Sequence, residues 1–180
     1  KAIKYVKKYE NMKYTPLTGK KYPTKDGAPL WIGDTSVEDK FDMIYKRGSV
    51  CAGLMNVLRR YMDLELPGNI TGMEKSEFVG GTGEWFKYLD DMKRLEEIDF
   101  NKVYPKGTLL LQNYNLKDQG HLAMTINSSK NGLLNTKIIH AVRDKPVSKY
   151  NKTIIEKLGE YPNYKRFTHI CYPENWLIKN

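Results

Sequence analysis

A cysteine at the start of a predicted helix is the side chain best placed for nucleophilic chemistry. Cys51 follows Ser49, a favoured N-cap residue, by two positions. The helix continues as an apolar stripe through Leu54, Val57, Leu58, Tyr61 and Met62. Unpaired backbone N–H groups and the positive end of the helix dipole favour a thiolate there, so we expect a lowered pKa for the Cys51 thiol. The alternative role is that of a small buried hydrophobe.

Two histidines lie on predicted strands that a hairpin can bring together. The dipeptide Asn131-Gly132 between them is a strong hairpin signal. With this dipeptide at the centre of the turn, His121 lies opposite Val142, and His140 lies diagonally from His121 on the same face of the sheet. A slip of one residue would put the two rings on opposite faces, so this register is a requirement of any shared site. The alternative for His140 is a strand histidine with satisfied hydrogen bonds.

A thiol at a helix start that faces two imidazoles on a sheet is the arrangement of papain-like catalysis. In this interpretation Cys51 attacks a carbonyl, His121 takes and returns the proton, and His140 holds His121 in the useful tautomer. The backbone N–H of Cys51 is a natural oxyanion donor. Gln119 and Asn127 are further polar candidates for the oxyanion or orienting role, with a solvated loop end as their alternative.

Helical patterns come first along the sequence and strand patterns follow them, and these elements must position the candidate residues. This order predicts an α+β fold, with N-terminal helices and an antiparallel sheet after them. Helices are expected over residues 1–13, after Ser49, and over 84–97; strands are expected over 108–114, 120–128, 136–143 and 167–173. An irregular stretch rich in proline and glycine separates Tyr14 from Gly48.

The tryptophans are expected to be core or lid anchors: Trp31, Trp85 and Trp176. His169 and Cys171 share one strand face and are expected to be structural.

Taken in order, these segments resemble the NlpC-type cysteine peptidases, a papain-like group that includes bacterial cell-wall endopeptidases. The resemblance is carried by the opening helix with Tyr14 and by five short motifs: residues 50–54 (VCAGL), 66–67 (LP), 105–109 (PKGTL), 120–123 (GHLA) and 139–141 (IHA).

The resemblance implies one papain-like domain over 1–180, with helices packed on an antiparallel sheet and an insertion at about 20–47. It implies a catalytic triad of Cys51, His121 and His140. The expected substrate-binding residues are Tyr14, Val50, Ala52 and Gln119.

The residues on either side of the nucleophile depart from the pattern of the bacterial peptidases. Those enzymes usually carry Asp before and Ser after the cysteine, where they hold the amine end of a stem peptide, whereas this chain has Val50 and Ala52. A cell-wall peptide is therefore a doubtful substrate. Divergent relatives include proteins of large viruses and acyl-chain hydrolases or acyltransferases, so the bond attacked is an amide, an ester or a thioester. The main expectation is a cysteine peptidase or amidase.

Composition and net charge limit the partners and the alternative functions that this protein can have. The chain has 180 residues and a net charge of +9, which favours weak binding of polyanions, although a lysine-rich mixture is also typical of AT-rich genomes. A catalytically inactive relative that binds a polyanion or a structural partner is therefore the alternative function.

With two cysteines, three histidines and no zinc spacing, neither a metal nor a cofactor is expected. No apolar run is long enough to span a bilayer, and the first residues show no signal region. These features favour a soluble, cytoplasmic or particle-associated protein. The chain does not start with Met, which is compatible with removal of an upstream segment ahead of Lys1.

Overall fold

The computed structural model describes residues 1–15, 41–76, 79–113, 120–143 and 151–178. Most of the insertion expected at about 20–47 lies outside the described residues, as do Gln119 and Trp31. Residues Phe41–Arg47, at its end, form helix α2.

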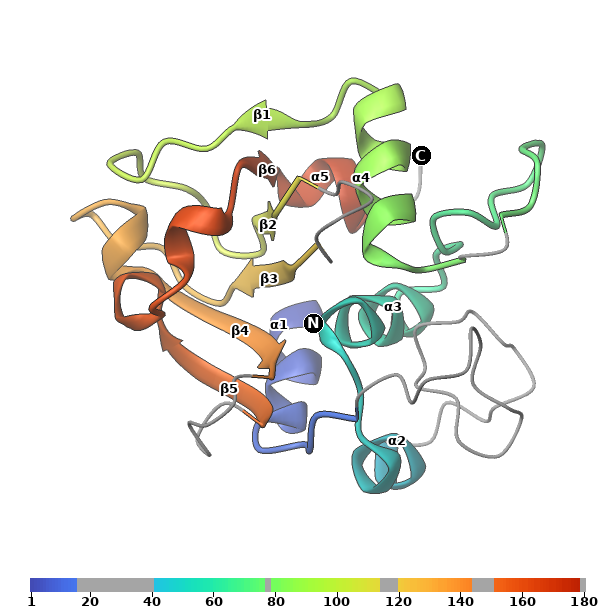
Figure 1. Ribbon diagram of the computed structural model, residues 1–180, viewed down its shortest axis with the longest axis horizontal. Helices are drawn as coiled ribbons and strands as arrows, with labels where there is room; N and C mark the ends of the chain where they lie inside the picture. Colours follow the sequence, from blue (N-terminus) through green and yellow to red (C-terminus); the bar gives the residue numbers. More distant parts are fainter. Residues whose placement is uncertain (16–40, 77–78, 114–119, 144–150, 179–180) are drawn as a thin grey trace.

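Within the described residues the strands form one six-stranded antiparallel sheet, in the order β1-β6-β2-β3-β4-β5 (Figure 1). The strands are β1 Glu96–Glu97, β2 Leu109–Leu111, β3 Leu122–Thr125, β4 Lys137–Val142, β5 Lys152–Lys157 and β6 His169–Cys171. The sheet is built mainly by neighbours in sequence, and only β6 crosses back to lie between β1 and β2.

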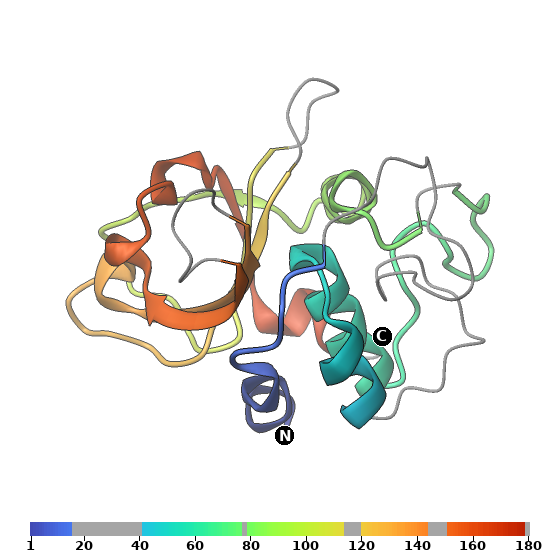
Figure 2. The ribbon, with the colours of Figure 1, turned by 60° about the horizontal axis from the view of Figure 1, so that its bottom comes forward.

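The helices lie mainly to one side of the strands, as Figure 2 shows. They are α1 Ala2–Val6, α2, α3 Cys51–Tyr61, α4 Thr82–Asp91 and α5 Pro173–Trp176. Helix α3 packs against α1, β3 and β4. The α+β class predicted from the order of elements is confirmed. In the described parts of the chain, no helix has the length and apolar content needed to cross a membrane.

Both faces of the sheet are buried, because alternate strand residues enter two different cores. One core joins helices α1, α3, α4 and α5 to the face that carries Leu109, Leu111, Leu122, Met124 and Ile139. The other lies under Tyr104, Leu133, Leu158, Tyr161 and Phe167, on the face of Leu110, Ala123, Ile138, Val142 and Ile170. Trp85 and Trp176 belong to the first core, with ring centroids 5.7 Å apart, which confirms them as core anchors.

Several element boundaries differ from the sequence predictions. The N-terminal helix is shorter, since α1 passes into a 3-10 turn at Lys7–Tyr9 and Asn11 takes a positive φ of 66°. The predicted helix 84–97 instead runs from Thr82 to Asp91, and β1 follows it. The strands are shorter than expected, and β5 was not predicted.

The predicted N-cap of the nucleophile helix is wrong by one residue. The N-cap is Val50, with extended backbone, and the Ser49 hydroxyl donates to the Val50 carbonyl at 3.2 Å instead of capping the helix. Cys51 is therefore the first residue of α3, and the helix starts without a side-chain cap.

A short N-terminal segment joins the sheet to the start of α3. The N–H of Asn11 donates to Thr153 O at 2.8 Å, and the N–H of Thr153 donates to Met12 O at 2.7 Å, so the segment covers the free edge of β5. On its other side, the N–H of Ser49 donates to Lys13 O at 3.2 Å. Gly48 has φ +83°, and a Cβ there would lie 2.5 Å from Lys13 O, so this close approach requires glycine.

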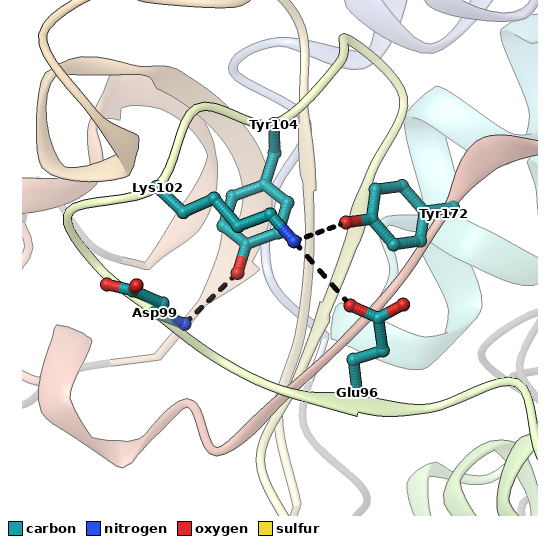
Figure 3. A network of polar contacts seen from close by, with 5 residues as sticks. All are labelled: Glu96, Asp99, Lys102, Tyr104 and Tyr172. Atoms are coloured by element: carbon teal, nitrogen blue, oxygen red, sulfur yellow. Dashed lines mark hydrogen bonds and ion pairs between the residues drawn. The ribbon is translucent and has the colours of Figure 1, made fainter.

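A polar network fastens the loop between β1 and β2 to the chain that follows β6 (Figure 3). Lys102 Nζ donates to the Tyr172 hydroxyl at 2.9 Å and lies 3.8 Å from a Glu96 carboxylate oxygen. The same ammonium lies 5.3 Å from the ring centroid of Tyr104, whose hydroxyl accepts the Asp99 N–H at 3.1 Å. The two rings and one cation thus join segments that lie far apart in the sequence.

A buried amide joins α3 to α4. Asn56 is fully buried, its Nδ2 donates to Gly80 O at 2.9 Å, and its Oδ1 accepts the Trp85 indole N–H at 2.8 Å. Both partners would lose a buried hydrogen bond if the amide were removed.

We expect Asn56→Ala to lower the free energy of unfolding by about 2–4 kcal/mol, because two buried polar groups lose their partners. Urea unfolding followed by circular dichroism measures this loss. The matched control is Asn69→Ala in an exposed loop, expected to change stability by less than about 0.5 kcal/mol. Equal losses in the two variants would show that the Asn56 bridge contributes nothing.

Candidate active site

The thiol of Cys51 lies where two strands of the sheet separate. Strands β3 and β4 pair only at Met124↔Ile139 and Thr125↔Ile138. Extending this register would place Leu122 opposite Ala141. The N–H of Leu122 instead donates to the Cys51 sulfur. The start of α3 therefore occupies the gap between the two strands.

The register that the sequence predicted for the two histidine-bearing strands is confirmed, because the observed pairs extend to His121 opposite Val142. The turn is different, however. The connection is a wider loop with a 3-10 turn at Leu133–Asn135, and the Asn127 side chain closes it by accepting the Lys137 N–H at 2.7 Å. Asn127 thus caps a loop, as its alternative interpretation expected.

A chain of hydrogen bonds runs from the first histidine into the sheet. His121 Nε2 lies 3.0 Å from His140 Nδ1, so both rings lie on one face. His140 is fully buried, and its Nε2 lies 3.0 Å from a carboxylate oxygen of Glu156 on β5. The Glu156 side chain is itself only 8% exposed.

This geometry assigns the ring protons when His140 is neutral. With Glu156 ionised, its carboxylate only accepts hydrogen bonds, so the Nε2 of His140 carries a hydrogen that it donates to Glu156. Nδ1 of His140 then accepts, and His121 donates to it from Nε2. The Nδ1 of a neutral His121 is therefore the unprotonated ring nitrogen, which is the one able to take a proton.

Burial favours the neutral form of both rings. It lowers the pKa of His140 to about 3. Burial also lowers the pKa of His121 well below its ordinary value; the charge of Arg166 acts in the same direction, and so would a positive charge on His140. Both rings are thus uncharged at neutral pH, as the assignment of protons requires.

Aromatic side chains surround the two imidazoles. The Tyr161 ring stands nearly perpendicular to His140 with centroids 4.8 Å apart, and it lies 5.9 Å from His121. The Phe167 ring lies 5.5 Å from His121. These rings exclude water from one side of the pair and restrict how the imidazoles can turn.

Tyr14 is bridged through its backbone to Ser49, two residues before Cys51. It is half-buried, and burial raises the pKa of its phenol. Negative charge on Cys51 or Tyr161 would raise that pKa further, against the opposing effect of Arg143. The Tyr14 hydroxyl therefore stays protonated at neutral pH and can donate a hydrogen bond beside Cys51.

The predicted lowering of the Cys51 pKa is wrong. The thiol is only 7% exposed, and burial raises its pKa. The N–H groups of Leu122, Ala52 and Cys51 itself act in the opposite direction, as a helix start should, but desolvation outweighs them. The resting site therefore holds a protonated thiol, and a base must accept its proton when the sulfur reacts.

The remaining residues singled out from the sequence are the neighbours of Cys51, Gln119, and the pair His169 and Cys171. Val50 and Ala52 are buried, at 8% and 2% exposure, and Gln119 lies outside the described residues. Cys171 is fully buried, and burial raises its pKa to about 12. His169 contacts the Phe86 ring at 5.0 Å. In the described ranges, no three His, Cys, Asp or Glu side chains are arranged to hold a metal ion.

Glu156 is the site residue that sequence reasoning missed. It lies on β5, whose residues Thr153, Ile154 and Ile155 form a short β-branched run between two lysines. That run is the signal that could have predicted the strand. β5 pairs with β4 so that Glu156 faces Ile138, diagonal to His140.

No protein-family model matches the chain, and no curated protein matches it.

The neutral histidines predict a stability that falls in acid. Below the unfolded-state pKa of about 6.5, both histidines are protonated in the unfolded chain but stay neutral in the folded protein, because their folded-state pKa values are lowered. The free energy of unfolding therefore decreases as pH falls. At pH 5 the expected loss is about 2 kcal/mol for each of the two rings. Urea unfolding at pH 7.5 and pH 5.0 measures it.

The His140→Asn variant removes one of the two titrating groups and should roughly halve this acid-dependent loss. His169→Asn, outside the hydrogen-bonded chain, is the control and should leave the loss unchanged. An identical loss in wild type and His140→Asn would mean that His140 is not held neutral in the folded protein.

Proposed function

We propose that this protein is a thiol-dependent hydrolase of the papain-like NlpC type, a cysteine peptidase or amidase that forms an acyl-enzyme on Cys51. The observation that carries the proposal is that the Cys51 thiol accepts a hydrogen bond from the N–H of Leu122, the residue after His121, whose ring is hydrogen-bonded to His140. A nucleophile, a base and an orienting group are what acyl transfer needs.

The arrangement of the elements also supports the proposal. The nucleophile lies at the first residue of a buried helix that precedes the sheet. His140 lies on β4, and His121 lies just before β3, the strand that pairs with β4. This order agrees with the resemblance to the NlpC-type peptidases, in which the cysteine motif comes before the histidine motif. We further propose that the chain is a single domain of this type, with an insertion at about 20–47.

The first chemical step is attack on a substrate carbonyl. The sulfur of Cys51 forms a bond to the carbonyl carbon while its proton moves to Nδ1 of His121, and the carbonyl electron pair moves to oxygen. The Nε2–H of His121 stays on its hydrogen bond to His140, which stabilises the imidazolium. Because burial raises the pKa of the thiol, proton transfer and attack are expected to occur together.

The second step releases the leaving group. The backbone N–H of Cys51 and the protonated hydroxyl of Tyr14 are the donors proposed for the oxyanion, and one such donor contributes about 3–4 kcal/mol to transition-state stabilisation. When the oxyanion collapses, the carbon–leaving-group bond breaks and the leaving group takes the proton from His121 Nδ1. Water, activated by the same nitrogen, then hydrolyses the thioester.

The immediate neighbours of Cys51 bear on the substrate. Val50 and Ala52 are apolar and buried, so their side chains supply no charge for the amine end of a cell-wall peptide. A peptide or amide without that group is the proposed substrate. Acyl-chain hydrolysis or acyl transfer needs the same intermediate and differs only in the group that leaves or accepts.

One observation favours a second candidate, a catalytically inactive relative that binds a polyanion or a structural partner. The Cys51 thiol is almost fully buried with a raised pKa, and the chain carries a net charge of +9. If this candidate is correct, binding to nucleic acid should weaken steeply with salt, and Cys51 should be as unreactive as a core thiol.

An activated ester separates the two candidates without knowledge of the natural substrate. With p-nitrophenyl acetate, we expect a burst of one nitrophenol per protein and one acetyl group on Cys51, detected by peptide mass spectrometry. His121→Ala should slow the burst at least about 100-fold, because the general base is lost.

His169→Ala is the matched histidine control and should leave the burst unchanged, whereas Cys51→Ala should abolish it. Acetylation of Cys51 at the same rate in wild type and His121→Ala would contradict the proposed hydrolase. The absence of acetylation in the wild-type protein would favour the inactive relative.

A further inference from the structure

We infer that Glu156 is a positioning residue for the proposed acyl transfer: its hydrogen bond to His140 holds both imidazoles in the tautomer that leaves Nδ1 of His121 able to take the thiol proton. This inference rests on the proposed function and extends its triad by a fourth group.

The geometry allows Glu156 to act only through His140. The carboxylate lies 3.0 Å from Nε2 of His140, and the opposite side of that ring lies 3.0 Å from His121. Three side chains, from the residue before β3, from β4 and from β5, thus form one line of hydrogen bonds. His140 is fully buried and Glu156 nearly so, which limits competition from water for these bonds.

Without an acceptor at Nε2, His140 could place its proton on either nitrogen. With the proton on Nδ1, His140 would donate to His121 Nε2, and His121 would then carry its own proton on Nδ1, facing away from His140. That tautomer cannot accept a proton from the thiol. An acceptor at Glu156 excludes it, because Nε2 of His140 must then donate.

The negative charge of Glu156 has a second effect, on the protonated state that forms during the reaction. When His121 takes the thiol proton, the positive charge is stabilised through His140 by a carboxylate in a poorly solvated environment. A role in stability alone is a weaker explanation, because burying a carboxylate costs free energy, and a hydrogen bond from a neutral ring offsets this cost only in part.

Two substitutions separate the acceptor from the charge. Glu156→Gln retains an oxygen that can accept from His140 but removes the charge, whereas Glu156→Leu removes both. Glu160→Gln, on the exposed 3-10 turn that follows β5, is the matched control. Two readouts are needed: ¹⁵N chemical shifts of the histidine rings, which report the tautomers without any substrate, and the acetylation rate of Cys51 by p-nitrophenyl acetate as a function of pH.

We expect Nε2-protonated rings for His121 and His140 in the wild type and in Glu156→Gln, and a mixture of tautomers in Glu156→Leu. We expect Glu156→Gln to acetylate about tenfold more slowly, with the acid limb of its pH profile shifted to lower pH because the imidazolium is less stabilised. Loss of folded protein alone would lower the amplitude of the burst without moving this limb. Glu160→Gln should behave as wild type in both readouts.

Unchanged tautomers in Glu156→Leu would overturn the inference, and so would a Glu156→Gln profile identical to that of the wild type. Failure of the wild-type protein to acetylate would instead overturn the proposed function. The ring shifts would then still decide whether Glu156 sets the tautomers, so the two failures are distinguishable.

Discussion

The hydrogen bond between the two imidazoles depends on one strand register. Antiparallel pairing of Met124 with Ile139 puts His121 and His140 on the same face, and a slip of one residue would place one ring in the core under the helices. The register is held by burial on both faces, because Leu122 and Met124 enter one core while Ala123 enters the other. A requirement of packing thus fixes the chemistry of the site.

The second constraint is that the two strands must separate just where the histidines lie. A regular ladder would have paired Leu122 with β4 and left no room for the thiol. Because the start of α3 lies where β3 and β4 are no longer paired, the Leu122 N–H donates to the Cys51 sulfur and not to a carbonyl of β4. The buried polar groups therefore stay satisfied while the sheet opens. The desolvation that accompanies this insertion is also what raises the pKa of the thiol.

Local patterns were sufficient to predict the nucleophile helix, the two histidine strands and their register. The register was right although the predicted turn was not, because the wider loop, which contains the 3-10 turn at Leu133–Asn135, is centred on Asn131-Gly132 as the tight turn would be. Periodicity determines which residues of one strand share a face, and the centre of the connection, which is the same for both turns, determines the register between the strands.

The features that the sequence did not predict depend on contacts between distant segments. Glu156 gains its role only when β5 pairs with β4, and nothing in its local pattern shows a partner across the sheet. The direction of the Cys51 pKa depends on how deeply the thiol is buried, and a helix start by itself indicates only the opposing effect of the N–H groups. The early end of α1 reflects the bonding of residues 11–14 to the edge of β5, which local helix propensity cannot show.

The segment from Asn11 to Thr15 touches both halves of this arrangement, with hydrogen bonds to Thr153 and Asn151 on one side and to Ser49 on the other. These bonds are few and lie at the margin of the sheet, where local opening is commonly less costly than global unfolding. Detachment of this one segment would release the backbone ahead of Cys51 and displace Tyr14 while the strands remain paired. The hydrogen-exchange rates of the Tyr14 and Thr153 amides would therefore report how often this segment opens while the rest of the protein stays folded.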